Sequence, residues 1–362
     1  MKKNYLGYLL RLIPIFCLTA LVTSCGKDKK VGPSGITLPL VQYGSDNAKR
    51  LFLPISKIGS QTVSYFTIFD TGSSGMTMDA ADILPPNMIS SSGIIVPGDS
   101  VLINGITVTS QTSTISFGSK TALTKEYGNL AYAPITIGDK NGSTTIKRIP
   151  FFLYYKIIDQ NGNQLPAHSS DIFGVGPGTN FAFNAILSPL SYINYSTGLT
   201  SGFKLATLNS NDFNTTNGIY VPGLLTIGLT ESDLSAGSGF IMHPLNQSSS
   251  GGYSPNIAAT LSYSGNNISA FVLFDTGTPS ITIIEDPNAT NSIGDLPVNT
   301  TVTLTTNEGF RYQYVTNSTS TLTEVENPNL TGDYRTIFSI DFFIQNEYLT
   351  DYINHQIGLK NN

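Results

Sequence analysis

The chain contains no tryptophan, two cysteines and few charged residues. The scarcity of cysteine and of basic residues excludes particular kinds of site and partner. Only 12% of its 362 residues are Asp, Glu, Lys or Arg, and the formal net charge is −5. Lys and Arg form no cluster of the kind that contacts phosphates, so we expect no nucleic-acid partner. Loss of Cys17 with an N-terminal signal would leave only Cys25, which excludes an internal disulfide and a thiolate metal site. No metal site is expected, because no ligand spacing links the three histidines, His168, His243 and His355.

The N-terminal segment has the composition of a secretion signal. Lys2, Lys3 and Arg11 are basic, and residues 12–21 form an apolar run too short to span a bilayer well. Val-Thr-Ser-Cys at the next positions is a lipobox, with small residues before a cysteine. We therefore expect residues 1–24 to be a bacterial lipoprotein signal peptide, cleaved before a lipidated Cys25. An ordinary signal peptide or an uncleaved anchor is the alternative.

The lipobox also predicts a location. A lipid on Cys25 would anchor the mature protein to a membrane of the bacterial cell envelope. Gly26 follows this cysteine, whereas Asp at that position retains some lipoproteins in the inner membrane, so the outer membrane is favoured. Residues 25–37 are expected to be a flexible tether.

Short apolar runs separated by Gly, Asn, Ser and Pro occupy the rest of the chain, which is typical of an all-β protein. No long amphipathic helix is expected, although residues 80–83 and 340–351 could form short ones. The length suffices for two cores, and the turn-rich segment 194–202 predicts an N-terminal lobe over 38–198 and a C-terminal lobe over 199–362. The clearest expected strands are residues 51–55, 63–69, 130–137, 151–158, 224–229 and 271–274.

One phrase occurs twice, at a constant offset of 205 residues (275 − 70). Residues 66–78 read FTIFDTGSSGMTM, and residues 271–283 read FVLFDTGTPSITI. The repeat places one carboxylate, Asp70 or Asp275, at the same position in each half of the chain. If the halves pack face to face, the carboxyl groups meet. Because two adjacent carboxyls cannot easily both ionise, they would share a proton and divide the acid and base roles.

The paired Asp-Thr-Gly phrases and their surroundings resemble the pepsin-like aspartic proteases. Other segments that resemble this family are 50–59 (the first hairpin), 116–119 (the flap), 171–176 (the element beside the first Asp loop), and 337–344 with 355–359 (closure of the second lobe). The resemblance implies an all-β, bilobal fold with a central cleft and a hairpin flap. It also implies an aspartic endopeptidase that acts on a peptide or protein substrate, without metal or cofactor, and we expect a monomer. The hydroxyls of Ser73 and Thr278, each three residues after an aspartate, would stabilise the ionised form of the pair, so we expect the fastest reaction on the acid side of neutrality.

The resemblance assigns roles to individual residues. It makes Asp70 and Asp275 the catalytic pair. The supporting residues are Thr71 and Thr276, which would lock the two loops, Gly72 and Gly277, which let the chain turn sharply, and Ser73 and Thr278, which would donate to the outer carboxylate oxygens. The flap residues in contact with substrate would be Phe117, Gly118 and Ser119.

Three positions depart from the family pattern. Phe117 stands where the flap usually has Tyr, Ile340 stands where the second lobe is expected to have Gly, and no Trp follows the first Asp loop. The alternative function is therefore a catalytically inactive pepsin-like lipoprotein that binds a peptide or glycan in the cleft between the lobes.

Overall fold

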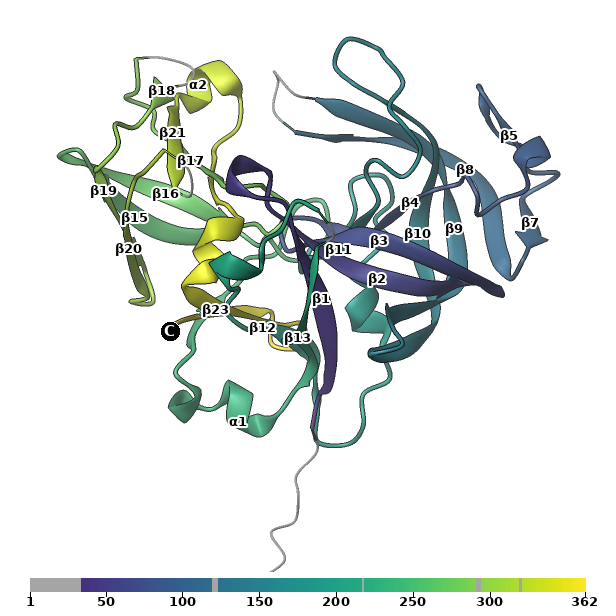
Figure 1. Cartoon of the computed structure of the whole chain (residues 1–362), viewed down its shortest axis with the longest axis horizontal. Helices are drawn as coiled ribbons and strands as arrows, with labels where there is room; N and C mark the ends of the chain where they lie inside the picture. Colours follow the sequence, from purple (N-terminus) through teal and green to yellow (C-terminus); the bar gives the residue numbers. More distant parts are fainter. Residues whose placement is uncertain (1–33, 119–122, 217, 291–293, 319–320) are drawn as a thin grey trace, which may run out of the picture. The chain divides into compact units, whose positions relative to one another are not determined.

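Two large β-sheets make up most of the described chain (Figure 1). The computed structural model describes residues 34–118, 123–216, 218–290, 294–318 and 321–362. The expected signal peptide, Cys25, most of the tether and Ser119 therefore lie outside the described residues. Within those ranges, no helix has the length and apolar character needed to cross a membrane.

The larger sheet has fourteen strands, and it contains the strand that ends at Asp70. A further pairing between β2 and β9 closes six neighbouring strands, from β2 to β9, into a barrel. In spatial order the strands are β14 (Ile241–Pro244), β24 (Gln356–Asn361), β23 (Asn346–Asp351), β12 (Thr200–Leu205), β13 (Ile219–Leu229), β1 (Ile36–Tyr43), β2 (Arg50–Ile58), β3 (Gln61–Asp70), β11 (Ile172–Val175), β4 (Ser74–Asp79), β10 (Gly142–Ile158), β9 (Thr124–Asp139), β8 (Ile106–Phe117) and β7 (Ser100–Ile103).

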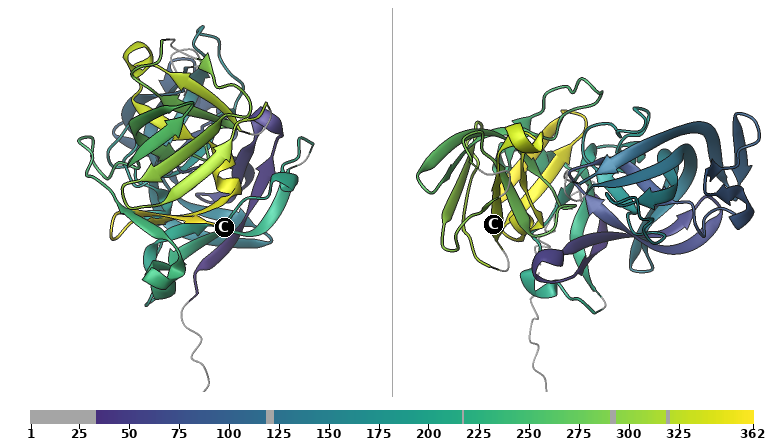
Figure 2. Two further views of the ribbon diagram at one scale, coloured as in Figure 1. Left: turned by 90° about the vertical axis from the view of Figure 1, so that its left-hand side faces the viewer. Right: turned by 90° about the horizontal axis from the view of Figure 1, so that it is seen from above.

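The smaller sheet has eight strands, which in spatial order are β18 (Gly294–Asp295), β21 (Leu322–Glu326), β17 (Ile281–Glu285), β22 (Arg335–Phe338), β16 (Asn266–Phe274), β15 (Ile257–Tyr263), β19 (Thr301–Thr306) and β20 (Arg311–Val315). Alternate side chains of its strands are buried, as the period of a strand with one covered face requires. These strands lie on the opposite side of β1 and β13 from β8, β9 and β10 (Figures 1 and 2). A separate pair of short strands is formed by β5 (Ile89–Ser90) and β6 (Gly93–Ile94).

Helices are short throughout the described residues: α1 (Glu231–Leu234), α2 (Pro328–Thr331), and the 3₁₀ turns η1 (Asp46–Ala48), η2 (Pro86–Met88), η3 (Pro189–Tyr192), η4 (Ser210–Asp212), η5 (Ala236–Ser238) and η6 (Ile340–Ile344). One of the two expected short helices was wrong, and the other was right only in part. Residues 80–83 form a bend and turn, and only the first part of 340–351 is helical, as η6. The remainder is strand β23, because it pairs on both sides, with β12 and with β24.

The six strands predicted most clearly from the sequence all lie within strands of the structure, β2, β3, β9, β10, β13 and β16. The expected division after residue 198 stays a prediction. The larger sheet passes through it, since Ile36 of β1 lies opposite Ile227 of β13 and Leu38 lies opposite Leu225. All described residues belong to one compact unit.

Candidate active site

Asp70 and Asp275 occupy equivalent ends of equivalent strands. Asp70 is the last residue of β3, and Asp275 directly follows β16. A short parallel strand supports each of them: β11 lies beside β3, and β22 lies beside β16. The residues that follow, 70–73 and 275–278, are called here the first and second Asp loops.

Each Asp loop brings its glycine against the carboxylate of the other loop. A Cβ atom added at Gly72 would lie 2.5 Å from Cγ of Asp275, and one added at Gly277 would lie 2.7 Å from Cγ of Asp70. Any side chain at either position would therefore overlap the opposite carboxyl group. This reciprocal contact shows that the structure brings the two halves of the repeat together as the sequence suggested.

Each carboxylate accepts hydrogen bonds from its own loop. The Gly72 and Ser73 amides donate to Oδ1 of Asp70 over 2.7 and 3.1 Å, and the Ser73 hydroxyl donates to Oδ2 over 2.5 Å. In the second loop, the Gly277 amide donates to Oδ1 of Asp275 over 2.7 Å, and the Thr278 hydroxyl donates to Oδ2 over 2.6 Å. The hydroxyl three residues after each aspartate thus holds one carboxylate oxygen, in the position that the sequence predicted.

Thr71 and Thr276 join the loops through four buried hydrogen bonds. The Thr71 hydroxyl accepts from the Thr276 amide (3.0 Å) and donates to the Phe274 carbonyl (2.7 Å). Reciprocally, the Thr276 hydroxyl accepts from the Thr71 amide (3.1 Å) and donates to the Phe69 carbonyl (2.6 Å). Neither threonine is exposed to solvent, so both hydroxyls satisfy backbone groups that water cannot reach.

The electrostatics of the pair favour a neutral form of Asp70. Burial raises the pKa of the Asp70 carboxyl well above its usual range, and the neighbouring Asp275 carboxyl raises it further. Hydrogen bonds from Ser73 and Gly72 to the ionised form act in the opposite direction. Asp275 is only partly buried, so this site retains access to solvent.

A crystal structure of an aspartic proteinase from Irpex lacteus shares this architecture. The two chains superpose with a TM-score of 0.56 over 90% of this chain and 97% of the other, at 18% sequence identity. The chain has the pepsin-like fold. No protein-family model matches the sequence, and no curated protein matches it. At this identity the comparison establishes the fold, and the roles of the Asp loops have to be argued from their own geometry.

The pairing of β16 with β22 corrects one prediction about this pepsin-like fold. In the first half, Gly174 of β11 lies opposite Asp70, and a Cβ added there would meet the Ser73 hydroxyl at 2.8 Å. In the second half, Phe274 lies opposite Phe338, so the residue in register with Asp275 is Ser339. Ser339, not Ile340, therefore occupies the position of the expected glycine. Compared with glycine, serine adds one hydroxymethyl group beside the second Asp loop.

The expected flap corresponds to the hairpin of β8 and β9. Phe117 ends β8 opposite Thr124, and Gly118 follows with a φ of +90°, a conformation that favours glycine. Ser119 lies outside the described residues. Phe117 packs with a second hydrophobic cluster, whose buried members are Ile115, Leu130, Phe152, Tyr154, Ile157 and Ile186. A Cβ added at Gly75 would lie 2.3 Å from Ile186, so this cluster reaches from the hairpin to the strand that follows the first Asp loop.

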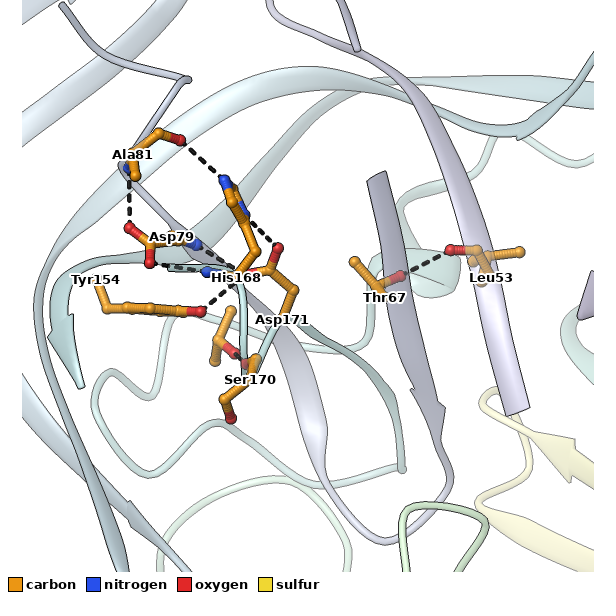
Figure 3. A network of polar contacts seen from close by, with 9 residues as sticks. Leu53, Thr67, Asp79, Ala81, Tyr154, His168, Ser170 and Asp171 are labelled. Atoms are coloured by element: carbon orange, nitrogen blue, oxygen red, sulfur yellow. Dashed lines mark hydrogen bonds and ion pairs between the residues drawn. The ribbon is translucent and has the colours of Figure 1, made fainter. Parts of the chain in front are cut away.

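A polar network fixes the ends of the strands behind the first Asp loop (Figure 3). Oδ1 of Asp171 accepts from the Asp79 amide (2.8 Å) and from the Tyr154 hydroxyl (2.9 Å). The ring of His168 bridges Oδ2 of Asp171 (2.7 Å) and the Ala81 carbonyl (3.1 Å). Because both ring nitrogens face oxygen acceptors, the charged imidazolium suits this position, and the hydrogen bond to Asp171 raises the pKa of His168.

Sequence reasoning missed a buried ion pair beside the second Asp loop. Nζ of Lys49 lies 2.8 Å from Oδ1 of Asp341, and both side chains are buried. Burial raises the pKa of Asp341 to about 6, although Lys49 opposes this shift. Asp341 belongs to η6, whose first amide, that of Ile340, donates to the Thr278 carbonyl over 3.1 Å. No local pattern could have revealed this pair, because 292 residues separate its members.

Sequence reasoning also missed Glu126 of β9, whose side chain is completely buried. Burial raises its pKa to about 8.

Among the described residues, no group of three or more His, Cys, Asp or Glu side chains is placed to hold a metal ion. The arrangement of the Asp loops is suited instead to general acid and base chemistry on a bound water, since one carboxyl can hold a proton while the other accepts one.

Proposed function

We propose that the protein is an aspartic endopeptidase in which Asp70 and Asp275 share one proton. The observation that supports this most directly is the reciprocal packing of Gly72 and Gly277 on the opposite carboxylates. The two carboxyl groups are close enough for a hydrogen bond between them, and such a pair cannot readily carry two charges.

In the proposed reaction, an ionised carboxylate of the pair takes a proton from a bound water, which attacks the scissile carbonyl carbon. The protonated carboxyl group donates a hydrogen bond to the carbonyl oxygen, on which negative charge develops. The resulting tetrahedral intermediate collapses when the leaving nitrogen receives a proton, and the pair is again singly protonated. Ser73 and Thr278 hold the outer oxygens so that both carboxyl groups keep their orientation.

The substrate in this proposal is an extended peptide, with Phe117 and Gly118 above it as parts of the flap. Phe117 has no hydroxyl to join the hydrogen bonds of the pair, so we expect slower catalysis than when Tyr occupies this position. The same residues could hold a peptide or glycan without cleaving it, and experiment separates these two functions.

The test uses purified soluble protein, residues 37–362, and a mixed peptide library across a range of pH. Wild type should cleave peptides, and a pepstatin-type inhibitor should block cleavage. Asp70→Asn and Asp275→Asn should each abolish cleavage, with unchanged circular dichroism, because an amide cannot exchange the shared proton. If either variant kept a rate near that of wild type, the proposed pair would be wrong. Peptide binding without cleavage by wild type would establish the binding function.

We also propose that Cys25 carries a lipid that anchors the monomeric protein to the cell envelope, with the outer membrane as the expected location. Cys25→Ser should leave the signal uncleaved or release the protein from membranes, because lipid chains supply the affinity. Mass spectrometry of the N-terminus checks this. A full-length, unlipidated N-terminus on wild-type protein would contradict it.

A further inference from the structure

Arg50 begins the strand that lies beside the strand of Asp70. In the antiparallel pair of β2 and β3, Phe52 lies opposite Ile68 and Leu53 lies opposite Thr67. The pairing ends with Phe52 and Ile68, two residues short of Arg50 and of Asp70, so both of these residues lie at the same open end of the hairpin. Residues two apart on a strand project from the same face of the sheet, so Arg50 and Asp70 share the face of Phe52 and Ile68. The fold thus places a cation beside the proposed catalytic pair.

This cation has no carboxylate partner among the described residues. All ion pairs found there join other side chains, and the hydrogen bond that the Arg50 guanidinium makes goes to the backbone carbonyl of Lys49 over 3.0 Å. The adjacent Lys49 shows the contrast, since it is buried against Asp341. A guanidinium carries five N–H donors in a fork that matches a carboxylate. Arg50 therefore keeps most of its donors available.

The surroundings of Arg50 make an anion favourable there. The side chain is partly buried, and burial lowers the pKa of the guanidinium, whereas the charges of Asp275 and Asp70 raise it. The proposed pair is thus close enough to act on Arg50, yet neither aspartate forms an ion pair with it. Asp70 is already held by the Gly72 amide and the Ser73 hydroxyl. A desolvated cation without a contacting anion favours a ligand that supplies one.

We propose that Arg50 binds a carboxylate of the substrate and makes the protein select peptides with an acidic side chain at one position near the scissile bond. This inference rests on the proposed function, because it treats the region beside Asp70 as the place where the peptide lies. The carboxylate could also be a free C-terminus, which has the same chemistry and would make cleavage depend on distance from the chain end.

The test compares peptides that differ only by Glu or Gln, with the substitution moved one position at a time across the scissile bond. Wild type should prefer Glu at one position by about 10-fold or more in kcat/KM, as expected for a charge-assisted hydrogen bond in a partly desolvated site. Arg50→Gln should abolish this preference, Arg50→Lys should keep part of it, and Arg50→Glu should favour Lys at the same position. Amidated and free C-termini, compared in parallel, distinguish the two sources of the carboxylate.

Lys57→Gln is the matched control, since Lys57 is an exposed cation on the same strand, seven residues from Arg50 (57 − 50). It should leave the Glu-to-Gln ratio unchanged. An unchanged ratio in Arg50→Gln, or no acidic preference in wild type at any position, would overturn the assignment. Thermal melting shows whether each variant is folded, and Arg50→Lys serves if Arg50→Gln is not.

If the protein is not a peptidase, a binding measurement still tests the role of Arg50. If wild type cleaves no peptide, the same Glu and Gln peptides are measured by fluorescence anisotropy for binding to wild type and Arg50→Gln. Tighter binding of the Glu peptide to wild type alone would retain Arg50 as a carboxylate site in a binding protein. Equal binding by both proteins would reject it.

Discussion

Replacement of Thr71 by Val tests the link between the two Asp loops without depending on catalysis. Valine has nearly the shape of threonine but lacks the hydroxyl, so the change removes hydrogen bonds with little change in packing volume. Two buried backbone groups, the Phe274 carbonyl and the Thr276 amide, then lose the partner that they have at 2.7 and 3.0 Å.

Each buried group left without a partner costs about 1–3 kcal/mol. The expected loss in free energy of unfolding is therefore about 2–6 kcal/mol, a large part of the 5–15 kcal/mol that is usual for a domain. Thr276→Val should cost a similar amount, because it removes the two reciprocal bonds to Phe69 and Thr71. Thr71→Ser should stay close to wild type, since it keeps the hydroxyl.

Thr67→Val is the matched control, because Thr67 is a buried threonine of β3, the strand that leads into the first Asp loop. Its hydroxyl makes one bond, to the Leu53 carbonyl of the adjacent strand over 3.0 Å (Figure 3), and the same cost per buried group gives an expected loss of about 1–3 kcal/mol, half of that for Thr71→Val. Urea midpoints measure all these variants, and hydrogen exchange of the Thr276 amide reports directly on the lost bond. If Thr71→Val unfolded at the midpoint of wild type, or no earlier than Thr67→Val, the proposed lock between the loops would be refuted.

Four further predictions follow from the same contacts. In Gly72→Ala the new Cβ would lie 2.5 Å from Cγ of Asp275, so the Asp275 carboxyl has to move by about 1 Å, and kcat should fall about 100-fold. Gly237→Ala is the control: its new Cβ meets only the Ser235 hydroxyl at 3.9 Å, so kcat should not change. Ser73→Ala removes a hydrogen bond that lowers the pKa of Asp70, so the profile of kcat/KM against pH should move to higher pH, and movement to lower pH would contradict the assignment. Burial raises the pKa of Glu126 to about 8, so the folded protein keeps a proton that the unfolded chain releases near pH 4.5. The free energy of unfolding should therefore fall by up to roughly 5 kcal/mol as the pH rises from 4.5 to about 8. Urea midpoints of Glu126→Gln should depend less on pH than those of wild type. Lys49→Met leaves the Asp341 carboxylate buried without its cation and should lower the free energy of unfolding by about 3–5 kcal/mol. The double variant Lys49→Met, Asp341→Leu should recover most of that loss in the same urea assay.

The sequence predicted the strands and the meeting of the Asp loops because both depend on local or repeated patterns. Apolar runs between turn residues identify strands such as β3 and β16, and the repeat itself specifies that Asp70 and Asp275 are equivalent. The hydroxyls of Ser73 and Thr278 were predictable for the same reason, since a spacing of three residues fixes their distance from the carboxylate.

Features that depend on pairing between distant segments were not predictable. The resemblance predicted Ile340 beside the second Asp loop, but the pairing of β16 with β22 puts Ser339 there. The strand character of residues 346–351 comes from two neighbours that the local pattern does not show. Arg50 and Lys49 are adjacent in the sequence, and only the fold reveals that Lys49 forms an ion pair with Asp341 whereas Arg50 forms none with any described residue.

Strand β1 has a mechanical consequence for the whole molecule. Its residues pair with β13 along most of their length, from Ile36 to Gln42, and with β2 from Val41 to Tyr43. A pull at Ile36 directed along the axis of β1 would load the hydrogen bonds to both neighbouring strands in shear, so that several would have to break together. The same strand transmits the load to β2 and, through the hairpin with β3, toward Asp70.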